Sequence, residues 1–368
     1  MSLHFGIIGA GNGGHAFAAY LGMKEVEVNW FDIDPKVVEV INDQGGVYVD
    51  GQLNGFAPVR NATTDMKELI DSSDVLMVVA PANAHRIIAR NCAPYLKDDQ
   101  IVILNPGSTG GALEFHQELK KSGCSAEIIL AETQSLLFAC RLKKAGHVSI
   151  FGVKRYLPFA TFPSNKIESV YELLSPVFPE FRKGENVLEI SLGNVNAILH
   201  PAPSLFNLPQ VEKQIPFLHY WEGITGGISI LLDKMDEERL EIGKAYQLSL
   251  PSTKDLLRSF YGVEGDTMEE LVQNNQAYKT ITGANSFSSR YFTEDIPMGL
   301  IPMQELARAA NVPTPTIDAI IQLSSSIFKD DFKSSARTLD RLGLSQMTLH
   351  EILQYVEHGE AQKIINNQ

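Results

Sequence analysis

Cysteines and closely spaced histidines are scarce in this sequence of 368 residues, which limits the sites it can form. The three cysteines, Cys92, Cys124 and Cys140, are odd in number, far apart and free of any Cys-x-x-Cys motif. This pattern argues against a disulfide framework and a zinc site, and it suits a reducing compartment. No two of the nine histidines lie within five residues of each other, so helix-borne metal pairs are missing. We therefore expect no metal centre.

Basic charge and long apolar runs are also lacking. The net charge of −13 argues against nucleic acid or an anionic membrane surface as the main partner. No apolar run approaches the length of a membrane span, and the N-terminus turns glycine-rich too early for a secretory signal. We expect a cytoplasmic enzyme with small-molecule substrates. Every face of its helices could belong to a core or to an interface, so a homodimer is one assembly that the sequence allows.

The opening of the chain carries a pattern that predicts a dinucleotide site. A short apolar strand over 3–8 runs into Gly-x-Gly-x-x-Gly at Gly9, Gly11 and Gly14, and a helical pattern follows. These glycines permit a tight turn, close approach to a pyrophosphate, and close packing of helix on strand. About 20 residues further on, as this motif requires, a second strand ends in Asp32, which can bind a ribose hydroxyl. Asp32 would repel a 2′-phosphate, so we expect NADH rather than NADPH as cofactor.

Alternating strands and helices predict a doubly wound parallel sheet, that is, an N-terminal Rossmann domain of α/β class. Ligands of such sheets bind beyond the carboxyl ends of the strands. The expected strands cover 26–31, 74–81, 100–104, 127–130 and 147–153, with a hairpin at 45–59 and helices at 35–41, 65–70, 84–92 and 112–121. The predicted cofactor-binding residues are Gly9, Gly11, Asn12, Gly13, Gly14, Asp32, Pro81, Asn105 and Gly107.

The apolar spacing changes near residue 185 and is helical almost throughout the rest of the chain. The expected helices cover 195–206, 218–232, 237–248, 253–261, 303–310 and 317–328. We therefore predict an NAD-binding Rossmann domain over 1–185 and an all-helical substrate domain over 186–368. Substrate would meet cofactor in the cleft between such domains.

One stretch of the helical half places a histidine at a predicted helix break. His200 precedes Pro201 and lies close to Asn194 and Asn196. Histidine titrates near neutrality, so it can take and return a proton during carbonyl or imine reduction. A histidine that merely caps a kinked helix is an equally good interpretation of this stretch alone.

A second stretch combines an arginine with acids and aromatic residues. Arg290 offers a planar fork suited to a carboxylate, and Asp295 could hold His200 in one tautomer. The carboxylate would leave the other ring nitrogen free toward substrate, and its charge should raise the pKa of His200. The alternative is a surface loop with a rim salt bridge, which is the commoner role of such charges.

Several motifs, taken in order along the chain, resemble the opine dehydrogenase family of octopine/nopaline type. They are Gly11–Leu21, Leu104–Gly107, Asn194–Ala197, His200–Pro201, Tyr220, Glu222–Thr225, Arg290–Phe292, Glu294–Asp295, Asn311–Pro315 and Arg337–Leu339. Such enzymes use a reduced nicotinamide cofactor to condense the amine of an amino acid with a 2-oxo acid, usually pyruvate. The resemblance implies an NAD-dependent oxidoreductase acting on CH–NH donors.

The same resemblance assigns roles to individual residues. It implies that His200 and Asp295 form a catalytic pair and that Arg290 binds the carboxylate of the oxo acid. Cys140 and Thr109 resemble positions that line the amino-acid site, and Asn196 completes the substrate-binding set. The amino acid itself is not set by these residues, because one or two side chains in the pocket decide it.

Two other functions compete with this interpretation. A ketopantoate reductase or glycerol-3-phosphate dehydrogenase would have the same two-domain layout, but these enzymes resemble each other in depending on a lysine early in the helical domain. This chain has no lysine between Lys183 and Lys213. A non-catalytic nucleotide sensor is the third hypothesis, and it would need neither the proton carrier nor the anion-binding arginine.

Overall fold

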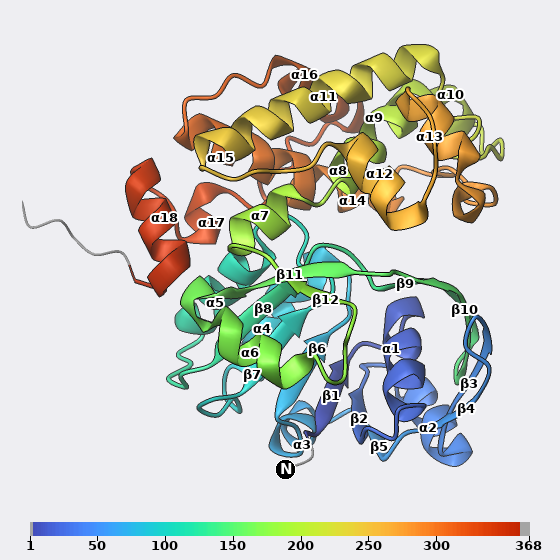
Figure 1. Cartoon of the computed structure of the whole chain (residues 1–368), viewed down its shortest axis with the longest axis vertical. Helices are drawn as coiled ribbons and strands as arrows, with labels where there is room; N and C mark the ends of the chain where they lie inside the picture. Colours follow the sequence, from blue (N-terminus) through green and yellow to red (C-terminus); the bar gives the residue numbers. More distant parts are fainter. Residues whose placement is uncertain (1–2, 361–368) are drawn as a thin grey trace, which may run out of the picture. The chain divides into compact units, whose positions relative to one another are not determined.

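The computed structural model describes residues 3–360, which divide into two compact units. The N-terminal unit comprises residues up to 107, 111–190 and 356–359, and the helical unit comprises 108–110 and 191–355. Figure 1 shows that strands dominate the first unit and helices the second. The predicted class, a Rossmann-type sheet followed by a helical domain, is confirmed. Among residues 3–360, no helix is long and apolar enough to cross a membrane.

The main sheet of the N-terminal unit has eight strands in the order β12-β11-β8-β7-β6-β1-β2-β5 (Figure 1). All neighbours are parallel except β11, which runs antiparallel to β8. Every residue of β1, β2, β6 and β7 is buried, as expected for strands covered on both faces. The strands are β1 Phe5–Ile8, β2 Val28–Phe31, β5 Asn61–Thr63, β6 Val75–Val78, β7 Ile101–Leu104, β8 Ile129–Thr133, β11 Leu157–Phe162 and β12 Phe181–Lys183.

A second sheet corrects one expectation. Strand β10 (His147–Val153) does not join the parallel sheet; it lies in a four-stranded sheet of order β4-β3-β10-β9. The connection to β9 (Phe138–Lys144) is too short for a crossover, because Lys144 already pairs with His147. Only a hairpin fits such a turn, whereas a parallel neighbour needs a dozen or more connecting residues. Strands β3 (Gly46–Gly51) and β4 (Gly55–Pro58) form the expected antiparallel hairpin.

Helix α1 (Asn12–Gly22) packs between the two sheets. Its residues 14–22 are all buried, since it contacts β1 and β2 on one side and β3, β4, β9 and β10 on another. A helix that is apolar on all sides, as this one is, belongs in such an interior. The other helices of the unit are α2 Pro35–Gln44, α3 Met66–Asp71, η1 Ala82–Ala84, α4 His85–Cys92, α5 Gly111–Lys121, η2 Ser164–Lys166 and α6 Ile167–Leu174.

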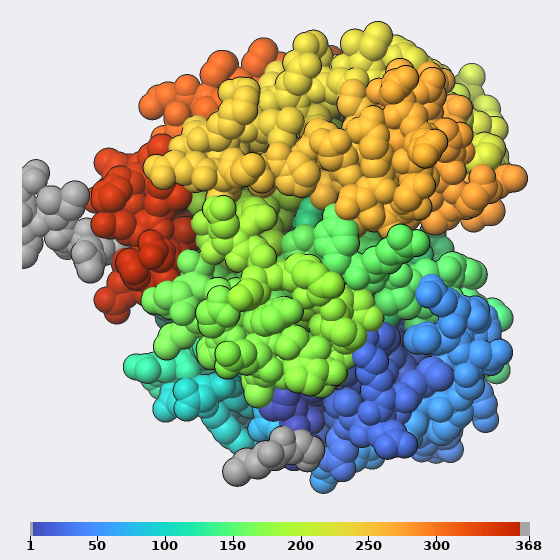
Figure 2. All heavy atoms as spheres, viewed as in Figure 1, coloured from blue at the N-terminus to red at the C-terminus, as the bar shows by residue number. Residues whose placement is uncertain are grey.

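The helical unit departs from expectation at its longest element. The predicted helices 218–232 and 237–248 are one helix, α11 (Gly226–Ala245), because no Gly or Pro interrupts residues 228–242. Residues 218–223 instead form a turn, in which the Glu222 carboxylate accepts from the Leu218 N–H at 2.6 Å. The space-filling view shows α11 (yellow) at the surface of this face (Figure 2).

Most of the remaining helices of the chain are short, and several have a proline in their first turn. They are α7 Val187–Leu192, α8 Asn196–Leu199, α9 Pro201–Phe206, α10 Leu208–Glu212, α12 Thr253–Tyr261, α13 Met268–Asn274, η3 Gln276–Tyr278, α14 Arg290–Thr293, η4 Ile296–Leu300, α15 Ile301–Ala309, α16 Pro315–Phe328, α17 Leu339–Leu342 and α18 Leu349–His358. The break expected before Pro201 is present: α8 ends at Leu199 and α9 begins at Pro201.

Candidate active site

The glycine-rich loop between β1 and α1 has the geometry that the motif requires. A Cβ on Gly14 would lie 1.9 Å from the Gly9 carbonyl oxygen, so only glycine lets α1 pack on β1 this closely. Gly9 has a φ of +107°. A Cβ on Gly11 would meet no atom within 4 Å, and no side chain caps the start of α1. The exposed start of α1 therefore offers unpaired N–H groups and a positive dipole end to an anion.

The acid at the end of β2 is tied to this loop. The Asp32 carboxylate accepts hydrogen bonds from the Ala10 N–H at 2.5 Å and the Asp34 N–H at 2.9 Å. The side chain is half-buried, so part of it stays available to a ligand. The structure thus places Asp32 beside the glycine loop, where a ribose hydroxyl could donate to it.

Two buried aromatic side chains, to which the sequence analysis assigned no role, form hydrogen bonds with the glycine loop. The Trp30 indole N–H donates to the Gly9 carbonyl at 3.0 Å. His15 bonds the Gly11 carbonyl through Nδ1 and accepts from the Gly146 N–H through Nε2, each at 3.0 Å. Burial lowers the pKa of His15, which keeps the ring neutral, so one ring nitrogen can donate and the other can accept. His15 lies in the Gly11–Leu21 motif, but no role was assigned to it, and Trp30 belongs to no motif. The contacts of both depend on the packing of β2 and β10 beside α1.

The carboxyl ends of β6 and β7 carry three more of the predicted cofactor residues. Pro81 is exposed and precedes η1. The Asn105 side chain donates to the Ile103 carbonyl, while its buried Oδ1 has no partner among the described residues. A Cβ on Gly107 would lie 2.1 Å from a carboxylate oxygen of Glu132. Gly107 is therefore required by its packing against that buried acid, and Asn105 presents an unsatisfied acceptor.

Cys140, predicted to line the amino-acid site, contacts the glycine loop. Its thiol donates to the Asn12 carbonyl at 3.4 Å, and the Asn12 side-chain oxygen accepts from the Leu142 N–H at 2.8 Å. Burial raises the pKa of the Cys140 thiol to about 11, so the group is a thiol and not a thiolate at neutral pH. In the structure, Cys140 and Asn12 join β9 to the start of α1.

His200 and Asp295 meet in the interior of the helical unit, although 95 positions separate them. His200 Nδ1 lies 2.8 Å from the Asp295 carboxylate, and the two residues are 3% and 9% exposed. His200 lies between α8 and α9, and Asp295 directly precedes η4. A Cβ on Gly299 would lie 2.7 Å from that of Ala197, so the close approach of η4 to α8 needs a glycine.

The second ring nitrogen of His200 is not free, which corrects the sequence-based expectation. His200 Nε2 lies 2.8 Å from the Tyr220 hydroxyl. A carboxylate can only accept, so Nδ1 carries the hydrogen and Nε2 accepts from the Tyr220 O–H. The sequence includes Tyr220 in the family resemblance but indicates no role for it. Its contact with His200 depends on the turn at 218–223, which has no signature of its own.

Burial, and not the neighbouring anion, dominates the electrostatics of this pair. It lowers the pKa of His200 well below its usual value, with a further reduction from the Arg290 guanidinium. The expected upward shift of the His200 pKa is therefore wrong. Burial raises the pKa of Asp295 to about 7, against the opposing charge of Arg290. Near neutral pH the pair is thus a neutral imidazole beside a carboxyl group that is half ionised.

A second buried histidine, His219, adjoins the pair and was also missed. Its ring centroid lies 5.5 Å from that of His200 and 4.5 Å from that of Tyr291. His219 Nε2 bonds the Leu199 carbonyl at 3.0 Å, and its buried Nδ1 has no partner among the described residues. Burial lowers the pKa of His219 to about 3, so this ring remains neutral.

The predicted substrate residues of the helical unit differ in their accessibility. Arg290 is exposed, and its guanidinium has no hydrogen bond or ion pair within residues 3–360. The side-chain amide of half-buried Asn196 is likewise unpaired within that range. Thr109 is fully buried; its hydroxyl donates to the Ser191 carbonyl and its own carbonyl accepts from Arg337. The contacts of Thr109 are those of a structural residue.

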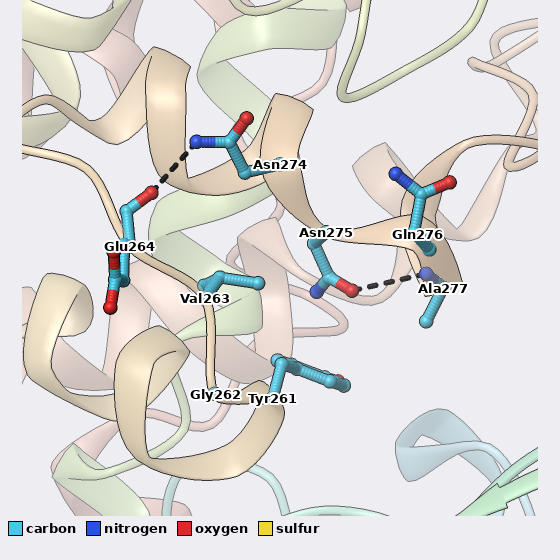
Figure 3. Close-up of a pocket in the computed structure, with 8 residues that line it drawn as sticks. All are labelled: Tyr261, Gly262, Val263, Glu264, Asn274, Asn275, Gln276 and Ala277. Carbon is cyan, nitrogen blue, oxygen red and sulfur yellow. Dashed lines mark hydrogen bonds between the residues drawn. The ribbon is translucent and has the colours of Figure 1, made fainter.

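A pocket of about 520 Å³ lies at the ends of α12 and α13, lined by Tyr261–Glu264 and Asn274–Ala277 (Figure 3). Asn275 caps η3 through its oxygen, while its buried Nδ2 has no partner among the described residues. The pocket contains none of the predicted site residues. The hydroxyl of Tyr261 in its wall lies 3.4 Å from that of Tyr278, whose ring stacks on that of Tyr220.

These features define a nucleotide-dependent dehydrogenase built from a Rossmann unit and a helical unit. Two family models match the chain: the NAD-dependent glycerol-3-phosphate dehydrogenase N-terminus over residues 4–131, and the NAD/NADP octopine/nopaline dehydrogenase α-helical domain over residues 183–328. An opine dehydrogenase of Arthrobacter sp. (strain 1C) is 43% identical over 354 residues, which covers 96% of this chain and 98% of the relative. The chain therefore belongs to the opine dehydrogenase family, a family of NAD-dependent oxidoreductases.

Solved structures agree with this fold. An octopine dehydrogenase bound to NADH and L-arginine matches with a TM-score of 0.81 at 22% identity, covering 98% of this chain and 99% of the other. Octopine dehydrogenase with NADH and pyruvate matches with a TM-score of 0.78 at 23% identity and the same coverage. The resemblance stated from the sequence is confirmed.

The glycine loop yields a paired prediction. Gly11→Ala should leave the Tm of the cofactor-free protein unchanged, because the new Cβ meets no protein atom. It should weaken NADH binding roughly tenfold or more, that is, by above about 1.4 kcal/mol, because the backbone can no longer approach the pyrophosphate. Gly14→Ala, the matched variant, should lower the Tm itself, since overpacking typically costs about 1–3 kcal/mol. Calorimetry and NADH titration would measure both; unchanged NADH affinity in Gly11→Ala would contradict the assignment.

Proposed function

We propose that this enzyme condenses the amine of an amino acid with a 2-oxo acid, most simply pyruvate, and reduces the resulting imine with NADH to an N-(carboxyalkyl) amino acid. The observation that carries the proposal is the buried His200–Asp295 pair, which the charge of Arg290 influences, in a chain of the opine dehydrogenase family. The pair can move a proton and Arg290 can bind a carboxylate, which are the two tasks of this reaction.

The residues of the N-terminal unit fit a nicotinamide dinucleotide. The start of α1 would bind the pyrophosphate, and Asp32 would accept from the adenosine ribose. The buried Oδ1 of Asn105, which has no donor among the described residues, would accept from the nicotinamide half. The bound cofactor supplies the hydride. Asp32 and Asp34 would repel a 2′-phosphate, which favours NADH over NADPH.

In the proposed reaction the protein manages one proton and one carboxylate. Neutral His200 takes a proton from the substrate ammonium group, so that the free amine can attack the carbonyl carbon. Ionised Asp295 stabilises the imidazolium that forms. A proton of the attached nitrogen moves to the former carbonyl oxygen to form the adduct hydroxyl. The proton held by His200 then returns to this hydroxyl, which leaves as water and gives the protonated imine. Arg290 binds the carboxylate of the oxo acid, and Asn196 is a second substrate-binding residue of the helical unit.

The alternative reductases fit the helical unit less well. Ketopantoate reductase and glycerol-3-phosphate dehydrogenase types would need a lysine where this chain has Asn194, Asn196 and His200. The glycerol-3-phosphate dehydrogenase model matches only the nucleotide-binding half, residues 4–131. The unit that would contact substrate matches the octopine/nopaline dehydrogenase model instead.

The same proposal includes a cytoplasmic location and a homodimer. All three cysteines are free, which suits a reducing compartment. Three large apolar side chains of the helical unit, Phe206, Ile215 and Ile230, are 53%, 51% and 66% exposed and would be available to a subunit interface. Sedimentation velocity would measure the oligomeric state directly.

The function can be tested by screening amino acids against pyruvate while following the absorbance of NADH. We expect oxidation of NADH that needs both substrates, and a higher kcat/KM with NADH than with NADPH. Oxidation by pyruvate alone would indicate a 2-hydroxy acid dehydrogenase instead. A higher kcat/KM with NADPH would show that Asp32 does not select the cofactor.

Arg290→Ala should weaken the use of the oxo acid far more than the binding of NADH. A charge-assisted bidentate contact contributes about 1.5–3 kcal/mol, so the KM for pyruvate should rise roughly tenfold or more. Arg290→Lys keeps the charge but not the fork, and should recover only part of the loss. Initial rates at varied pyruvate would measure this. An unchanged KM in Arg290→Ala would make Arg290 an ordinary surface residue.

The pair itself predicts a pH profile. Below pH 7 the buried Asp295 holds a proton, so the pair cannot take another from substrate; above about 7 it can. The kcat/KM for the amino acid should therefore rise with pH up to about 7, and Asp295→Asn should remove this rise.

His200→Ala should lower turnover about 10²–10⁴-fold with NADH still bound. The double variant, His200→Ala with Asp295→Asn, should be little worse than His200→Ala alone. Additive losses would mean that the two residues act independently.

A further inference from the structure

Both nitrogens of the His200 ring are already engaged within the helical unit. Nδ1 lies 2.8 Å from the Asp295 carboxylate and Nε2 lies 2.8 Å from the Tyr220 hydroxyl. The histidine itself is 3% exposed. On the Nε2 side, a substrate can therefore exchange a proton with His200 in two ways: Tyr220, itself 4% exposed, moves away, or Tyr220 passes the proton on.

The packing around Tyr220 argues against its moving away. Its ring stacks on Tyr278 with centroids 3.9 Å apart and planes 13° apart. The His219 ring meets it edge-on at 4.8 Å. The backbone beneath is fixed as well, because His219 N–H donates to the Ile281 carbonyl at 2.8 Å and a bridge joins Leu218 to Thr282. Releasing Nε2 would break the hydrogen bond and both ring contacts at once.

The bonding of the Tyr220 hydroxyl suits a proton relay. Its hydrogen points at His200 Nε2, which leaves the oxygen lone pairs free to accept a proton from another group. The titratable groups around it are His200, His219, Tyr261, Tyr278, Tyr291 and, beyond His200, Asp295 with Arg290. Burial among them raises the pKa of Tyr220 well above its usual value, so the hydroxyl does not ionise in the resting enzyme.

We propose that the Tyr220 hydroxyl, and not a ring nitrogen of His200, is the group that exchanges protons with the substrate. The proposal rests on the proposed function and refines it. Asp295, His200 and Tyr220 then form one hydrogen-bonded chain whose outer end is a phenol oxygen. The histidine is the proton store in the middle of the chain, and it never touches substrate.

The proton balance of this relay closes within one turnover. An N–H bond of the substrate ammonium breaks as its proton reaches the Tyr220 oxygen, and the tyrosine's own proton moves to His200 Nε2. The freed lone pair forms the C–N bond with the carbonyl carbon, and a proton of the attached nitrogen moves to the former carbonyl oxygen to give the adduct hydroxyl. In reverse, the stored proton returns through Tyr220 to that hydroxyl, and the C–O bond breaks as water leaves. The protonated imine that remains would be reduced by hydride from the bound cofactor, and the product amine takes its proton from solvent.

Tyr220→Phe is the direct test, because it removes the hydroxyl and keeps the ring that stacks on Tyr278. We expect kcat for condensation to fall about 10²-fold or more, with the Kd for NADH and the KM for pyruvate unchanged. The proton inventory in mixed H₂O and D₂O should be curved for the wild type, because two protons move together. A hydroxyl that only orients His200 would not produce that curvature.

Tyr246→Phe is the matched control. Tyr246 is also a buried tyrosine of the helical unit, and its hydroxyl donates to the Leu306 carbonyl at 3.0 Å. That carbonyl also accepts from the Ala310 N–H, so the variant leaves it bonded. Tyr246→Phe should lower the Tm slightly and leave kcat and the inventory unchanged. A Tm measured for each variant separates loss of the relay from loss of the fold.

Two outcomes separate the relay from the proposed function. If Tyr220→Phe keeps kcat within a few-fold of wild type while His200→Ala is inactive, the relay is wrong and the proposed function stands. If His200→Ala is also active, the proton chemistry of the proposed function fails.

Should Tyr220→Phe not fold, 3-fluorotyrosine at position 220 keeps the hydroxyl and makes it more acidic. The relay then requires a changed kcat and pH profile, and an unchanged profile would overturn it.

Discussion

The removal of two ionisable side chains from water is the constraint on which the helical unit depends. A carboxyl group and an imidazole are tolerated in an interior only when each has a hydrogen-bond partner. His200 and Asp295 satisfy each other, and each directly precedes a helix with a proline in its first turn, Pro201 and Pro297 respectively. The π-turn after Asp295 belongs to the same arrangement, since such irregular turns often occur at functional sites. The short helices around the pair follow from the need to bring these two side chains together.

Desolvation also explains why the upward shift of the His200 pKa predicted from the sequence was wrong. A neighbouring anion raises the pKa of a histidine and burial lowers it, and the sequence showed only the first of these. The structure shows that burial is nearly complete for both groups, so the neutral imidazole is favoured and the acid titrates near 7. This places the pair at a pKa where it can both take and return a proton at neutral pH.

Local patterns were predictable and contacts between distant segments were not. The glycine motif, Asp32 and the break at His200–Pro201 depend on spacing within a few residues or on one strand–helix–strand unit, so the sequence contains them. The roles of Tyr220, His219 and Trp30 depend on which turn or strand packs beside which. The second sheet was missed for a related reason: residues 147–153 have the composition of a buried strand, and only the tight turn before them decides which sheet they join.

The two halves of the chain carry different amounts of information about function. The N-terminal unit solves a general problem, binding a dinucleotide, and a glycerol-3-phosphate dehydrogenase model describes its first 131 residues adequately. What such a unit does with a hydride depends on the helical unit, which must hold the second substrate and control its protons. Where a lysine-dependent reductase would place one cation, this unit has a buried histidine with an acid on one side and a phenol on the other. A condensation needs a group that both removes and returns a proton, whereas reduction of a carbonyl needs only a donor. The two-sided environment of His200 is therefore the feature that suits this fold to joining two substrates.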